Sequence, residues 1–134
     1  MDPDPEWLIK ARTHMRQREH EQAIKLLLQL VRTDPKNTLA WREIGRILDG
    51  AGRRETALSA WIQVLALEPN DSEAVVASGL DQLAGKKFLQ AAEKLFLARR
   101  LWLTVEPSNE RLKMQIATVA GLGLALRELG YARA

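Results

Sequence analysis

Few residues in this chain could carry out acid–base, metal or nucleophilic chemistry, and their spacing does not suit it. His14 and His20 lie six residues apart, whereas two histidines that share a metal on one helix face lie three or four apart. Asp34, Asp49 and Glu55 have no evident partner for proton transfer. There is no cysteine, and no glycine motif follows a strand as a phosphate-binding loop would. We therefore predict that the chain is not an enzyme and uses no metal or cofactor.

The strongest pattern in the sequence runs from Trp41 to Pro69. Large apolar residues recur every three or four positions on both sides of the break Gly50-Ala51-Gly52, which predicts two amphipathic helices joined by a tight turn. The pattern recurs with a period of 34 residues in both directions. Two places always hold a small residue: Ala11, Gly45 and Gly79 in the first helices, and Ala23, Ala57 and Ala91 in the second. We expect these residues to allow close helix packing, with Trp7, Trp41 and Trp61 filling the space between layers.

A 34-residue period with small residues at two fixed places and a closing proline at Pro35 and Pro69 resembles the tetratricopeptide repeat. The resemblance implies an all-α fold, a right-handed α-solenoid of antiparallel helix pairs with about three and a half repeats. It implies one array over 1–134, with repeats at 4–37, 38–71 and 72–107 and a long helix at 108–134 that resembles the first helix of a fourth repeat. Gly79 and Gly123 are 44 residues apart, so we expect ten extra residues shared between a lengthened second helix of repeat three and the long helix.

Local signals mark the helix ends. Asp4 is predicted to cap the first helix with Pro5 at its first position, and the segment 34–37 is predicted to end the second helix and cap the third. The predicted helices are 5–17, 19–33, 72–83 and one that begins at 87 and stops only at Pro107, besides the pair in repeat two.

Composition supports helix packing and a protein partner. Hydrophobic residues make up 46% and aromatic residues 5%, and 20 basic residues nearly balance 17 acidic ones, so the net charge of +3 gives weak support for a polyanion. Nucleic-acid binding is therefore unlikely. The segment 1–5 is too acidic for a signal peptide, and the apolar run 116–126 is too short to cross a bilayer. We expect a cytoplasmic protein with no membrane span.

The resemblance further implies that the first helix of each repeat lines a concave groove. Following the helical spacing, that groove would carry ten residues: Leu8, Arg12, Met15, Arg16, Arg42, Arg46, Asp49, Val76, Leu80 and Leu83. Its arginines would engage carboxylates, and its apolar end would anchor a hydrophobic side chain. The alternative is that the arginines only solubilise the surface and the leucines cover the adjoining long helix. Relatives that clamp a C-terminal carboxylate are disfavoured, because two matching places hold Glu43 and Glu73.

These features predict a non-enzymatic protein–protein interaction scaffold or adaptor that binds an acidic and apolar peptide or helix segment in the groove. One alternative is a small secretion or assembly chaperone that holds an apolar client segment. A less likely alternative is nucleic-acid binding, which would show a steep dependence of affinity on salt.

The helix from Met114 to Leu129 is apolar almost all round, and such a helix is normally buried on all sides. We therefore predict a two-fold homodimer through the segment 102–131, with Trp102, Leu122, Leu126 and Leu129 in the interface. The alternative is that the long helix folds back into the groove, which would give a monomer.

Overall fold

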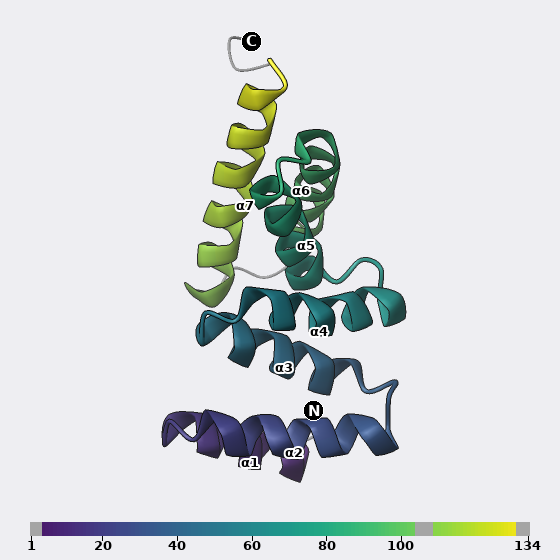
Figure 1. The fold of residues 1–134 in the computed structure, drawn as a ribbon, viewed down its shortest axis with the longest axis vertical. Helices are drawn as coiled ribbons and strands as arrows, with labels where there is room; N and C mark the ends of the chain where they lie inside the picture. Colours follow the sequence, from purple (N-terminus) through teal and green to yellow (C-terminus); the bar gives the residue numbers. More distant parts are fainter. Residues whose placement is uncertain (1–3, 104–108, 131–134) are drawn as a thin grey trace. The chain divides into compact units, whose positions relative to one another are not determined.

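The computed structural model describes residues 4–103 and 109–130, and these residues form seven helices and no strand. The chain divides into two compact units, 1–67 and 68–134. Unit 1 holds α1 (Glu6–Arg16), α2 (His20–Thr33), α3 (Thr38–Gly50) and α4 (Arg54–Leu67). Unit 2 holds α5 (Ser72–Ala84), α6 (Phe88–Trp102) and α7 (Asn109–Glu128) (Figure 1). The predicted all-α class is confirmed.

Polar side chains and prolines set the helix starts. Asn37 Oδ1 accepts a hydrogen bond of 3.1 Å from the Ala40 amide at the start of α3, and Asp71 Oδ1 accepts one of 3.0 Å from the Ala74 amide at the start of α5. The first helix begins differently from the prediction. Pro5 is its N-cap residue, and Asp4 instead accepts a hydrogen bond from Arg12 Nη1 at 3.3 Å. The proposed Asp4 cap is therefore wrong.

The same turn follows α1, α3 and α5. In each, three backbone amides bond back to the helix just completed, and the central residue has a positive φ: Arg18 (60°), Gly52 (77°) and Lys86 (61°). The amides of Gly52 and Arg53, for example, bond to Asp49 and Leu48 at 3.0 and 2.9 Å. These turns satisfy the last carbonyl groups of each helix and return the chain alongside it.

The small places recognised in the sequence lie where helices approach most closely. Ala11, Ala23, Ala57 and Ala91 are buried, as are Gly45 and Gly79. A Cβ atom on Gly45 would lie 2.6 Å from Trp61 Cε2, and one on Gly79 would lie 2.9 Å from Leu95 Cδ2. Each glycine therefore gives room to a large side chain of the second helix in its pair. Of the three tryptophans expected in the core, Trp61 is fully buried, whereas Trp7 and Trp41 are half-buried.

Unit 2 packs α7 against both α5 and α6 (Figure 1). Its core cluster includes Leu95 from α6 and Leu122 and Ala125 from α7. A buried hydrogen bond of 3.2 Å from Trp102 Nε1 to Thr118 Oγ1 joins α6 to α7. The expected extra length falls mainly on α7, which has 20 residues against 13 in α3, whereas α6 has 15 against 14 in α4. Residues 104–108 lie outside the described part of the chain.

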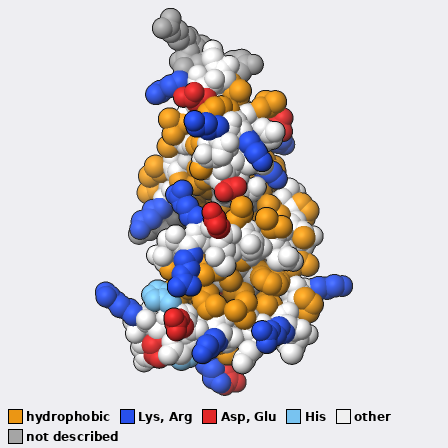
Figure 2. All heavy atoms as spheres, in the orientation of Figure 1, with side chains coloured by type: hydrophobic (Ala, Val, Ile, Leu, Met, Phe, Trp, Pro, Cys, Tyr) orange, Lys and Arg blue, Asp and Glu red, His pale blue; other side chains and the backbone are white. Residues whose placement is uncertain are grey.

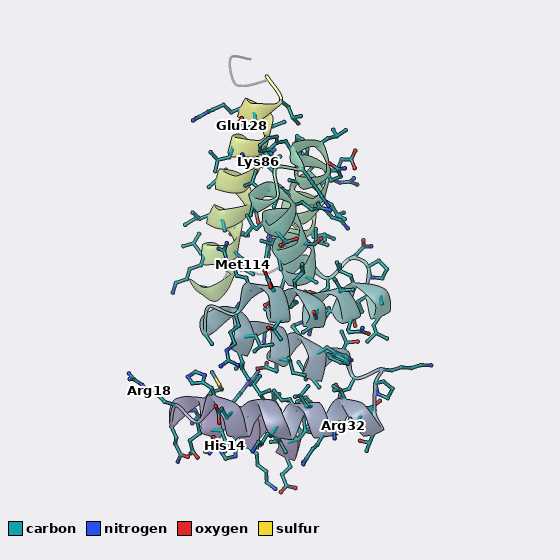
Figure 3. The ribbon with its side chains drawn as sticks, viewed as in Figure 1. His14, Arg18, Arg32, Lys86, Met114 and Glu128 are labelled. Atoms are coloured by element: carbon teal, nitrogen blue, oxygen red, sulfur yellow. The ribbon has the colours of Figure 1, made fainter. Side chains whose placement is uncertain are left out.

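A first prediction concerns the left-handed backbone at Lys86. A side chain in this conformation costs about 1–2 kcal/mol, while glycine loses about 0.5–1 kcal/mol in backbone entropy. Lys86→Gly is therefore expected to raise the free energy of unfolding by about 0.5–1 kcal/mol, measured by urea denaturation. Lys87→Gly is the matched control, because Lys87 has a φ of −89° and should gain nothing. A Lys86→Gly variant no more stable than wild type would contradict this account of the turn. Figure 3 labels Lys86.

A second prediction concerns the contact between Gly45 and Trp61. Gly45→Ala should lower the free energy of unfolding by about 1–3 kcal/mol, because the added methyl group overlaps the indole ring. In a Trp61→Leu background, Gly45→Ala should instead raise the free energy of unfolding by up to about 1 kcal/mol. The indole ring that the methyl group would overlap is then absent, and alanine has a higher helix propensity than glycine. Matching places in α1 and α2 already hold the buried pair Ala11 and Leu27. A double-mutant cycle by thermal and urea denaturation tests this change of sign, and additive effects would refute the steric explanation.

Candidate functional site

The candidate site is a hollow of about 300 Å³ between α1 and α3 in unit 1. Six residues line it: Arg12, Met15, Arg16, Glu43, Arg46 and Ile47. Successive helical turns place Arg12 and Arg16 on one face of α1, and Glu43 and Arg46 lie three residues apart on α3. Four of the six residues, Arg12, Met15, Arg16 and Arg46, were predicted from the sequence to line the groove.

Glu43 is the central residue of the hollow. Its side chain is only 9% exposed, and Oε1 accepts hydrogen bonds from Arg46 Nη1 at 2.8 Å and from Arg12 Nη2 at 3.5 Å. The carboxylate therefore holds arginines from two helices beside one another and offsets part of their charge. Asp4 adds a second, more exposed carboxylate 3.3 Å from Arg12.

The charge balance of the hollow is positive. Three arginines and Glu43 line the hollow, and Asp4 pairs with one of these arginines, Arg12. Each guanidinium has five N–H donors, so the bonds from Arg12 to Asp4 and Glu43 use only part of the donor capacity of Arg12. Met15 and the buried Ile47 add apolar surface next to these donors. The arrangement suits a carboxylate that is followed by an apolar group.

The other predicted groove residues of unit 1 lie elsewhere. Leu8 is 1% exposed and belongs to the core. Asp49 Oδ2 accepts a hydrogen bond of 2.9 Å from Trp61 Nε1, so its role is to orient the Trp61 indole between α3 and α4. Arg42 is half-buried, lies one turn before Arg46 on α3, and is not among the residues that line the hollow.

In unit 2 the residues predicted to form an apolar anchor are covered. Val76 is fully buried, and Leu80 and Leu83 are half-buried against the core cluster that α6 and α7 form. Leu80 Cδ2 lies 2.9 Å from the place where Gly121 of α7 would carry a Cβ atom. The alternative considered from the sequence, in which the leucines cover the long helix, therefore describes unit 2 better than an open apolar groove.

Leu122, Leu126 and Leu129, three of the four residues predicted for self-association, lie on the packed side of α7 and the turn after it, and the fourth, Trp102, ends α6. Trp102 and Leu122 are buried, and Leu126 and Leu129 pack against the core cluster of unit 2. In this structure a homodimer through α7 would have to use different residues of the helix. Self-association remains a prediction.

A second hollow, of about 740 Å³, lies in unit 1 around the turn after α1, the start of α2 and the end of α3. Its lining combines Ile24, Ile47 and Leu48 with side chains of both charges, including Glu19 and Arg53, and favours no particular ligand. It contains none of the residues predicted from the sequence to bind a partner. Among the described residues there is no group of three or more His, Cys, Asp or Glu side chains that could hold a metal ion. No helix in the same part of the chain is long and apolar enough to cross a membrane.

Comparison with known proteins identifies the family. Residues 10–72 match the tetratricopeptide repeat family, which confirms the resemblance found in the sequence. Residues 10–72, a little under half of the chain, therefore carry the tetratricopeptide repeat pattern. It is 27% identical over 81 residues to the mouse Superkiller complex protein 3. That match covers 60% of this chain but only 5% of the relative.

Solved structures of the same fold include domains in complexes with partners. The Yersinia enterocolitica type III secretion chaperone SycD, in complex with a peptide of the translocator YopD, superposes with a TM-score of 0.70 and 15% identity, covering 91% of this chain and 92% of SycD. The TPR2B domain of yeast Sti1, in a complex with pHsp70, gives a TM-score of 0.68 and 15% identity over 92% of this chain and 95% of that domain. At this identity the similarity establishes the fold alone.

A third prediction follows from the burial of Glu43. Glu43→Gln keeps the shape of the side chain but removes the charge that pairs with two arginines. We expect the free energy of unfolding to fall by about 1–2 kcal/mol at low salt, and by less in 1 M sodium chloride, where ion pairs are screened. Glu93→Gln, on the exposed surface of α6, is the control and should change stability little. Equal stability of the Glu43→Gln variant and wild type would show that the ion pairs add nothing.

Proposed function

We propose that this protein is a non-enzymatic interaction scaffold that binds an acidic peptide segment of another protein at the hollow between α1 and α3. A carboxylate of the segment contacts the guanidinium groups of Arg12, Arg16 and Arg46, and an apolar side chain next to it packs on Met15 and Ile47. The observation that carries the proposal is the convergence of arginines from two helices around one buried carboxylate. Arg42, one turn before Arg46, extends the same basic face in this proposal.

The fold supports this reading, since SycD and the Sti1 domain are both known in complexes with a peptide or protein partner. Binding to arginines favours carboxylates over neutral ligands, because each guanidinium can donate two parallel hydrogen bonds to one carboxylate. The alternative of a chaperone for an apolar client would need an apolar anchor other than Leu80 and Leu83, because both pack within unit 2. A nucleic acid would use the same arginines against phosphates, and the dependence of affinity on salt separates the two cases.

A fourth prediction tests the hollow with Arg16, which lines it without a part in the bonds to Glu43. The probe is an array of synthetic peptides in which one or two Glu or Asp residues precede a Leu, with neutral Gln versions as controls. Arg16→Glu is expected to weaken the tightest acidic peptide by about tenfold, measured by fluorescence anisotropy, while helicity stays unchanged. Arg54→Glu carries the same charge change on the exposed start of α4 and should leave the affinity within about twofold.

Glu43→Gln provides an independent check in the opposite direction. Removing the internal competitor for the arginines should tighten acidic peptides even as it lowers stability. Failure of both Arg16→Glu and Glu43→Gln to change peptide affinity would refute the site. Tighter binding of a single-stranded oligonucleotide than of any acidic peptide, with a steep loss of affinity in salt, would favour the nucleic-acid alternative.

A further inference from the structure

The end of α7 has the backbone geometry of a helix that is followed by a pairing helix. Gly130 has a φ of 90°, and its amide bonds to Arg127 O at 3.0 Å, while the amide of Leu129 bonds to Ala125 O at 3.0 Å. The end of α3 is built in the same way, with bonds from Gly52 to Asp49 and from Ala51 to Ile47, both at 3.0 Å. Aligning the two turns places Gly123 of α7 at the position of Gly45 in α3.

In the complete helix pairs this glycine is always covered. Trp61 of α4 lies over Gly45, and Leu95 of α6 lies over Gly79. At Gly123 the corresponding space is empty, because no atom of the described residues lies within 4 Å of an added Cβ atom. The neighbouring side chains on this side of the helix are apolar and exposed, with Leu112 at 53%, Ile116 at 60% and Val119 at 59%. Hydrophobic side chains are visible at the surface along the upper left of Figure 2, where Figure 1 places α7.

The charges beside this surface define which helix would fit it. In the α3–α4 pair, Asp49 accepts the hydrogen bond of the Trp61 indole. The matching position in α7 is Arg127, which can only donate hydrogen bonds, so a tryptophan over Gly123 would lose its acceptor. A leucine, as at Leu95, has no such need. Arg127 and Lys113 are both exposed near this surface, so acidic side chains on the incoming helix would be favoured.

We propose that the α7 face, defined by Leu112, Ile116, Val119 and Gly123, binds an acidic amphipathic helix of another protein in the way that α4 binds α3. A leucine of that helix occupies the space over Gly123, and an alanine four residues before it allows close approach. The same spacing is present in the second helices of this chain, where it is formed by Ala23 and Leu27, Ala57 and Trp61, and Ala91 and Leu95. The proposal adds a second surface to the protein and uses none of the arginines of α1 and α3.

The test uses the full chain and a synthetic peptide with the sequence of α2, His20–Thr33, in which Lys25 and Arg32 are replaced by Glu to make it acidic. This peptide keeps the Ala and Leu spacing. Gly123→Leu fills the space on the α7 face without meeting any described atom, so the variant should fold and melt at a higher temperature. We expect it to bind the labelled peptide at least about tenfold more weakly than wild type in fluorescence anisotropy. Replacing Leu27 of the peptide by Ala should cause a similar loss.

Three controls give the result its meaning. Glu128→Leu adds the same side chain to an exposed position on another side of α7 and should leave the peptide affinity unchanged. The comparison of Gly123 with Leu is repeated in an Arg16→Glu background, where the hollow between α1 and α3 is impaired, and the same loss of affinity is expected there, which separates the two surfaces. In nuclear magnetic resonance spectra, peptide addition should shift the amide signals of Val119 and Gly123.

Two results would overturn the proposal. One is equal peptide affinity of wild type and Gly123→Leu, including no binding by either. The other is a wild-type dimer in sedimentation equilibrium that Gly123→Leu converts to a monomer, because a second copy of this chain would then cover the α7 face. The expected result is a monomeric wild-type chain whose peptide binding depends on Gly123.

Discussion

The helix pairs of this protein depend on one steric constraint. A small residue on the first helix of a pair contacts a large side chain on the second helix, sixteen positions later in the sequence. Gly45 and Trp61 meet so closely that even a methyl group would overlap the ring. Gly79 and Leu95 do the same in unit 2. Close approach removes apolar surface from water and excludes voids, and it also fixes the rotation of each first helix about its own axis. That rotation decides which side chains of α1 and α3 face the hollow.

The site is a consequence of this arrangement rather than of any local motif. With α1 and α3 held by their partners, Arg12 and Arg46 are within reach of one carboxylate, although they are far apart in the sequence. Burial makes that carboxylate more effective than an exposed one, because less water competes for the arginines. The apolar surface of Met15 and Ile47 comes from the same two helices.

Periodicity in the sequence was sufficient to predict the helices, the small residues at their contacts and the cap of α3 within the segment 34–37, because each of these depends on near neighbours along the chain. It could not predict that Asp49 bonds to the Trp61 indole or that Glu43 lies beneath the arginines, because both depend on side-chain directions across helices. For the position of Glu43, the one available signal was its three-residue spacing from Arg46, which places both side chains on the same face of α3. The apolar groove was misplaced in unit 2, since apolar residues on α5 serve equally well to pack α7.

The carboxylate of Glu43 resembles, in its chemistry, the ligand that the arginines would bind. A ligand with a single weakly held carboxylate must compete with a group that is tethered in place at very high effective concentration. A ligand that presents two carboxylates, or a carboxylate with an apolar neighbour, gains contacts that Glu43 does not already make. In the proposed function, the buried glutamate would therefore set an affinity threshold that discriminates against small acids and in favour of longer segments.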